Sequence, residues 1–272
     1  MKAWQIWLAA AKARVQLPPR APRVPLLAAG EVIGSVEPDF LLQFASLGNT
    51  SGHCLLQKSE HSIENFSWVL QGGVTAGLAQ LAEALRQTGL AGTWRNELLR
   101  VRNEQGQPLG AVERAVVRPL GIATEAVHLV GFAPDGRIWV QQRALDKPND
   151  PGLWDTLMGG MVSVQDNLAQ ALARETWEEA GLRMDQLQDV QHGGHIDFAS
   201  PAHDGAGAGY LVERIDWYTA TVPSDVVPVN QDGEVAQFAC LTVSEVLHLM
   251  GQGLFTLEAG LILAAAKGLQ TT

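Results

Sequence analysis

The sequence predicts an α+β protein in which a mixed sheet lies between helices, preceded by a smaller N-terminal α+β unit. Residues 74–90 (VTAGLAQLAEALRQTGL) place apolar side chains at helical spacing and close at Gly89, a helix stop signal. Residues 126–132 (AVHLVGF) form a short apolar run that is typical of a buried strand. Strands and helices do not alternate strictly, so a mixed sheet is expected.

We place the division between the two parts at residue 115, giving an N-terminal α+β domain (1–115) and a second domain (116–272). Residues 1–19 predict an amphipathic helix, and the proline- and arginine-rich residues 17–25 predict an extended connector. The first domain should contain several helices and short strands. Its residues point to no chemistry of their own.

In the second domain, Pro134-Asp135-Gly136 predicts a turn between strands 126–132 and 137–143, and a loop should follow at 146–152. Segment 154–162 contains the Gly159-Gly160 pair, and Gly181 should end a helix that begins near Asn167. The remaining elements follow as strands at 195–198, 210–222 and 235–241 and helices at 244–250 and 257–267.

Composition narrows the classes of partner. The 272 residues are 46% hydrophobic and 18% charged, which suits a folded chain, and the net charge is −10. Nucleic-acid binders usually carry a basic surface, so nucleic acid is not the expected partner. A small phosphorylated ligand remains compatible, because a bound metal can supply positive charge.

Cys54 and Cys240 lie far apart, which argues against a disulfide framework or a zinc site and predicts ordinary buried thiols in a reducing compartment. The apolar N-terminal run stops at Lys12 and Arg14, unlike a signal peptide. Since no segment reaches the ~20 apolar residues of a membrane span, we expect a cytoplasmic protein without a membrane partner.

The chemistry is expected on the helix 167–180. Glu175, Glu178 and Glu179 share one helical face, where like charges repel by a few tenths of a kcal/mol per pair. A divalent cation would turn that repulsion into attraction, and hard carboxylate oxygens suit Mg²⁺ or Mn²⁺. The alternative is a solvated acidic face.

The flanking residues resemble the Nudix box, in which Gly, five residues, Glu and seven residues precede Arg-Glu-aliphatic-any-Glu-Glu-any-Gly-aliphatic. Gly160 opens the pattern here, and residues 174–182 (RETWEEAGL) close it. Asp166 replaces the first glutamate and Thr176 the first aliphatic residue, so seven of nine specified positions match. The resemblance implies a Nudix α/β/α sandwich with a mixed sheet and a pyrophosphohydrolase activity on a small-molecule diphosphate.

The resemblance also implies roles for individual residues. Glu175, Glu178 and Glu179 would ligate Mg²⁺ (or Mn²⁺), with one of them orienting the attacking water, and Arg174 would hold the carboxylates. The Gly159-Gly160 turn would let backbone approach the metal and phosphates. Glu234 is the candidate for a further metal ligand or general base. Its alternative is a simple Asp-Gly turn before a strand.

Four further residues are candidates for substrate binding. Arg143 and Lys147 could reach phosphate, although basic side chains at a strand end are often only solvated. His128 could contact substrate or be a satisfied core histidine. Trp139, in a strand, could stack on a heteroaromatic cation or fill the core.

A narrower resemblance is to Nudix proteins related to the N-terminal part of fungal thiamine pyrophosphokinases. It implies hydrolysis of thiamine diphosphate, or of its damaged forms, to the monophosphate. The residues that carry it are 94–97 (WRNE), 113–114 (ER), 127–132, 137–143 with 147–148 and 151–152, and 232–235 (DGEV).

Three alternatives stay open. The ligand could be ADP-ribose, a nucleotide sugar, a dinucleotide or a coenzyme A derivative, or the fold could bind a ligand without catalysis. An isoprenyl-diphosphate isomerase would need a nucleophilic cysteine near the box, and neither cysteine lies there in the sequence. The chain could also form a homodimer.

Overall fold

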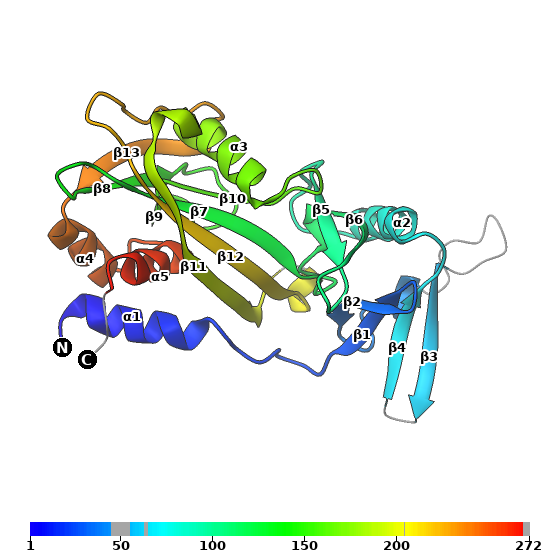
Figure 1. The fold of residues 1–272 in the computed structure, drawn as a ribbon. Coiled ribbons are helices and arrows are strands. Elements are labelled where there is room, and N and C mark those ends of the chain that lie inside the picture. Colours follow the sequence, from blue (N-terminus) through cyan, green and yellow to red (C-terminus); the bar gives the residue numbers. More distant parts are fainter. Residues whose placement is uncertain (45–54, 63–64, 204, 269–272) are drawn as a thin grey trace.

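The computed structural model describes residues 1–44, 55–62, 65–203 and 205–268. Its elements fall into two parts that lie side by side (Figure 1). The N-terminal helix lies with one part, and the strands that follow it in the chain lie in the other (Figure 1). Within the described residues, no helix is both long and apolar enough to cross a bilayer.

The first part is built around a sheet with strand order β2-β1-β4-β3, in which β1 and β4 are parallel and the other pairs are antiparallel. Helix α2 packs Leu78, Leu81 and Leu85 into its core. An antiparallel hairpin, β5–β6, connects this part to the second. The elements are β1 (Val24–Ala28), β2 (Glu31–Val36), β3 (Leu56–Ser62), β4 (Asn65–Leu70), α2 (Val74–Gln87), β5 (Leu98–Arg102) and β6 (Pro108–Glu113).

Within the described residues, the second part forms a seven-stranded mixed sheet with the main order β11-β12-β7-β8-β13. Strands β7 and β12 are parallel and the other pairs are antiparallel, as the irregular alternation predicted. The strands are β7 (Thr124–Phe132), β8 (Ile138–Arg143), β9 (Trp154–Asp155), β10 (Met158–Met161), β11 (Gln188–Pro201), β12 (Tyr210–Thr221) and β13 (Val235–Leu241).

Helices cover both faces of this sheet (Figure 1). Helix α3 (Leu168–Ala180) packs on one face through a cluster that includes Val127 and Leu172. Helices α1 (Ala3–Arg14), α4 (Val243–Gly251) and α5 (Leu257–Ala266) pack on the other. The α/β/α sandwich with a mixed sheet is therefore confirmed.

Helix α1 contributes Leu8 and Ala11 to the core shared with α4 and α5, although the sequence grouped it with the first part. Periodicity identified the helix but could not tell which apolar surface would receive it. The division at residue 115 remains a prediction. Within the described residues of that first part, the α-helices are α1 and α2, fewer than the several expected.

The sheet opens where the glycine pair lies. Strands β7 and β8 pair only at Gly131–Trp139 and Phe132–Ile138, next to their turn. Beyond it, β10 pairs with β7 and β9 pairs with β8. The β10 register sets Gly160 opposite Val127 and brings the backbone of β10 under helix α3.

Helix α3 has the ends that its sequence predicts. The Asn167 side chain caps the N-terminus by accepting a hydrogen bond from the Gln170 backbone N–H. The Gln170 side chain accepts in turn from the Asn167 backbone N–H. Gly181 ends the helix at φ +63°, a left-handed conformation that glycine adopts without steric cost. These caps fix which residues face the sheet.

The cysteine prediction is corrected in one respect. Cys240 on β13 is partly exposed rather than buried, because β13 is an edge strand of the sheet. Cys54 lies outside the described residues.

Thr176, which replaces the aliphatic residue of the box, is fully buried on α3, and its hydroxyl has no hydrogen-bond partner among the described residues. We expect Thr176→Val to raise the free energy of unfolding by about 1 kcal/mol, because an unpaired buried hydroxyl is removed without a change of shape. Urea denaturation measures the change. A Thr176→Val protein less stable than the parent, or a Thr176→Ser protein equally stable, would contradict this packing.

Candidate active site

Arg174 joins the acidic residues of the box. Its Nε lies 2.9 Å from Asp166 Oδ2, and its Nη1 lies 2.8 Å from Glu175 Oε1 and 2.9 Å from Glu178 Oε2. Its Nη2 donates to the Met161 carbonyl at 3.1 Å. One guanidinium thus links both ends of the box to strand β10.

Asp166 reaches Arg174 despite its shorter side chain. Its carboxylate also accepts from Ser163 Oγ at 3.1 Å, which closes the turn before α3. Arg100 of β5 donates to the Val164 and Asp166 carbonyls at 2.6 and 2.9 Å. The first part of the chain therefore braces the turn that carries Asp166.

The two glycines are required by their neighbours. A Cβ on Gly160 would lie 2.0 Å from Glu175 Cδ, and a Cβ on Gly159 would lie 2.5 Å from the His128 ring. Real atoms do not approach so closely, so only glycine allows Glu175 to lie against β10. The expected Gly159-Gly160 turn is wrong: the pair lies inside strand β10, because it pairs with His128 and Val127 of β7. The space beside the two glycines is taken by Glu175 and His128.

Glu179 points into the protein and is 3% exposed. Its Oε2 accepts from the Gly159 backbone N–H at 3.0 Å and from Gln141 Nε2 at 2.8 Å. Burial outweighs these bonds and raises the pKa of Glu179 to about 8. Burial likewise raises the pKa of Glu175 to about 7, although Arg174 opposes it.

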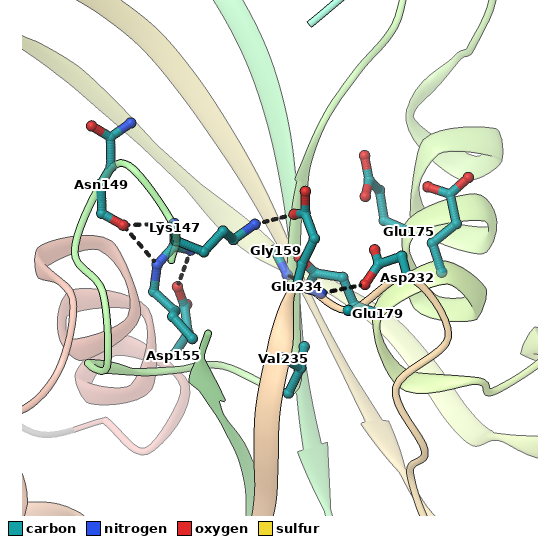
Figure 2. A network of polar contacts seen from close by, with 12 residues as sticks. Lys147, Asn149, Asp155, Gly159, Glu175, Glu179, Asp232, Glu234 and Val235 are labelled. Atoms are coloured by element: carbon teal, nitrogen blue, oxygen red, sulfur yellow. Dashed lines mark hydrogen bonds and ion pairs between the residues drawn. The ribbon is translucent and has the colours of Figure 1, made fainter. Parts of the chain in front are cut away.

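Glu234 and Lys147, both predicted from the sequence, form an ion pair across the mouth of the site. Figure 2 shows the carboxylates of Glu234, Asp232, Glu175 and Glu179 gathered around Gly159, with Lys147 approaching from the other side. Burial would raise the pKa of Glu234, but Lys147 holds it below its ordinary value.

Within the described ranges, no three His, Cys, Asp or Glu side chains form a ready-made metal cluster. In the structure Arg174 engages Glu175 and Glu178, while Gln141 engages Glu179. The donor set nevertheless suits a hard divalent cation. The carboxylates of Glu175 and Glu179, whose pKa values burial raises, offer hard oxygen ligands next to strand β10.

Arg143 and His128 do not lie among the carboxylates of the site and are engaged by other residues. Arg143 contacts Asp155 at 3.4 Å and donates to the Asn149 carbonyl at 3.1 Å, so it braces loop 146–152. His128 is 7% exposed, and its Nδ1 lies 2.9 Å from Thr156 Oγ1. Burial lowers the pKa of His128. His128 thus occupies a core position, the alternative given for it above, and does not reach the open face.

Trp139 lies away from the carboxylates. It pairs with Gly131 near the β7–β8 turn, whereas Gly160 pairs with Val127. It lines a separate pocket with Cys240 and Val226. The structure therefore does not bring it to the site, because one strand carries Trp139 and Arg143 toward opposite ends of the sheet.

Sequence reasoning missed three residues of this site: Gln141, Asp155 and Arg100. Gln141 left no clear signal, because alternation from the buried Ile138 and Val140 assigns Gln142, not Gln141, to their side of the strand. Arg100 left none, since its contacts lie 64 and 66 residues away along the chain.

The raised pKa of Glu179 predicts a pH-dependent stability in EDTA. The pKa of Glu179 is about 8 in the folded protein and 4.5 ordinarily, so the folded state favours the protonated carboxyl. The stability that this protonated group contributes is complete below pH 4.5 and is lost as pH rises through 8. We expect the free energy of unfolding to fall by roughly 2–4 kcal/mol between about pH 5 and about pH 8.5. Chemical denaturation at each pH measures it.

Glu179→Gln should reduce this slope, while the exposed control Glu83→Gln should retain it. An unchanged slope in Glu179→Gln would show that the carboxylate is not buried as described.

Comparison with known proteins places this geometry in a family. Residues 123–257 match the NUDIX domain model. Nudix hydrolase 24 of Arabidopsis thaliana, described as chloroplastic, is 28% identical over 180 residues, 65% of this chain and 48% of that protein. An uncharacterized Nudix hydrolase of Pseudomonas aeruginosa is 39% identical over 87 residues, 32% of this chain and 52% of that protein.

An isopentenyl-diphosphate Delta-isomerase of Kocuria rhizophila is 30% identical over 141 residues, 50% of this chain and 73% of that protein. The chain spans about half the length of the Arabidopsis and Pseudomonas relatives. The matched region contains the sheet, helix α3 and the glycine pair described above. The chain belongs to the Nudix superfamily.

Proposed function

We propose that this protein is a metal-dependent pyrophosphohydrolase that cleaves a phosphoanhydride bond in a small-molecule diphosphate. The observation that carries the proposal is the acidic face of α3, with Glu175 seated against Gly160 and Arg174 bridging Asp166, Glu175 and Glu178. Mg²⁺ (or Mn²⁺) held by Glu175, Glu178 and Glu179 would polarise the phosphoryl oxygens and make bound water acidic.

The residues of the chain have distinct parts in this proposal. Arg174 orients Glu175 and Glu178 by charge-assisted bonds. Glu234, charged and paired with Lys147 at the mouth, is the proposed general base or further ligand. Lys147 would move to the phosphate as the substrate arrives. Gln141 and the Gly159 N–H keep Glu179 in position.

For the substrate we propose thiamine diphosphate or a damaged form of it, converted to the monophosphate. The support is that Arg95 and Arg114, two residues of the narrower resemblance, lie next to the acidic face, since both charges act on Glu234. The region ahead of the Nudix domain therefore borders the site. The alternative substrates are ADP-ribose, a nucleotide sugar, a dinucleotide or a coenzyme A derivative.

The isomerase relative raises a second candidate activity, which the position of Cys240 disfavours. Cys240 pairs with Trp139 on β8 and lines the separate pocket at the turn end of the sheet. A nucleophilic thiol for isomerisation would have to lie at the carboxylates. The hydrolase proposal needs no such group.

Glu178→Gln should lower the turnover number at least ~100-fold, because it removes a principal source of negative charge at the proposed cation site. Steady-state phosphate or monophosphate release measures it, with Glu83→Gln as a matched exposed control. Unchanged turnover in Glu178→Gln would refute the metal assignment, and an inactive parent protein would support a ligand-binding role.

A substrate panel with Mg²⁺ tests the ligand. We expect monophosphate release from oxidised thiamine diphosphate, no turnover of ADP-ribose and no isomerisation of isopentenyl diphosphate, with products identified by mass. Turnover of ADP-ribose alone would move the protein to the nucleotide-directed alternative. A cytoplasmic location and a homodimer are also proposals, and fluorescent tagging and light scattering test them.

A further inference from the structure

The structure contains a cavity between the two parts of the chain. Residues within 92–118, at the end of the first part and the start of the second, form one wall, including Arg95, Arg114 and Arg118. Thr124, Met161 and Glu213 of the second part and residues 148–149 form the rest. The protein has a net charge of −10, so three arginines around one cavity are a local reversal of its overall charge.

Arg114 is fixed in place. Its Nη1 lies 2.7 Å from Glu97 Oε2, and its backbone N–H donates to the Glu97 carbonyl at 2.9 Å. The only carboxylate lining the cavity among the described residues, Glu213, accepts from Thr124 Oγ1 at 2.9 Å. Each of these two charged groups therefore already has a hydrogen-bond partner.

Arg95 differs from Arg114. Within residues 1–44, 55–62, 65–203 and 205–268, its guanidinium makes no hydrogen bond or ion pair. Its backbone is held, because the Arg95 N–H donates to Glu113 Oε1 at 3.1 Å. A tethered backbone with an uncommitted guanidinium at a cavity wall is suited to binding an anion.

The cavity also adjoins the carboxylates of the proposed active site. The charge of Arg114 interacts with Glu175, and the charge of Arg95 interacts with Glu234. Met161, which lines the cavity, offers its carbonyl to Arg174. A diphosphate that reaches the acidic face of α3 would therefore extend toward the arginines.

We propose that residues 92–118 complete the substrate site, with Arg95 as a binding residue for a phosphate group of the diphosphate and Arg114 as a fixed positive wall beside it. The first part of the chain then supplies part of the anion-binding surface, through Arg95 and Arg114. This inference rests on the proposed function in one respect, that the acidic face is where the bond is cleaved.

Titration calorimetry with inorganic pyrophosphate in EDTA tests the proposal without catalysis. The intact protein should bind pyrophosphate, and Arg95→Gln should raise the dissociation constant about tenfold, because it removes a charge-assisted bond. Arg95→Lys, which keeps a point charge but loses the planar fork, should fall between them. The exposed control Arg183→Gln should bind like the parent.

An Arg95→Gln protein that binds pyrophosphate as tightly as the parent overturns the proposal, as does a parent that does not bind it. Thermal unfolding of each variant separates lost binding from lost folding. The two proposals fail separately: unchanged turnover in Glu178→Gln removes the hydrolase, whereas unchanged pyrophosphate binding in Arg95→Gln removes only the arginine site.

Discussion

The bridging of three carboxylates by the Arg174 guanidinium is the interaction on which the candidate site depends. Asp166 lies before α3, while Glu175 and Glu178 lie on it, and repulsion alone would drive these charges apart. Because Arg174 also binds the Met161 carbonyl, the acidic face is tied to β10 as well. The glycines then decide how close it lies, since any side chain at 160 would displace Glu175.

Burial of the carboxylates imposes a cost that folding alone does not explain. Glu179 is nearly inaccessible and Glu175 largely so, and burial raises the pKa of both. Apolar residues at these positions would avoid the penalty of burying charge. A cation that binds the ionised carboxylates would offset the free-energy cost of burying them. The cost of burying Glu175 and Glu179 is therefore explained by the proposed function.

The two parts of the chain depend on each other at this site. Arg100 of β5 holds the turn before α3, so the first part sets the position of Asp166. Arg95 and Arg114 line the cavity beside the acidic face. Conversely, helix α1, which comes first in the chain, packs on the second part. The sequence of the first part did not reveal the role of Arg100, because its partners lie 64 and 66 residues away along the chain.

The resemblance of the box implied the α/β/α sandwich. The sequence by itself determined the local structure: the caps of α3 and the turn after β7. These features follow from residues within one or two turns of one another, so periodicity and capping preferences suffice. Only the tertiary structure decided that Lys147 pairs with Glu234, 87 residues away, and that His128 lies behind Gly159. It also placed Trp139 in a different pocket. The physical reason is that periodicity tells which side of a strand is buried, whereas strand register and packing between distant segments decide which buried groups meet.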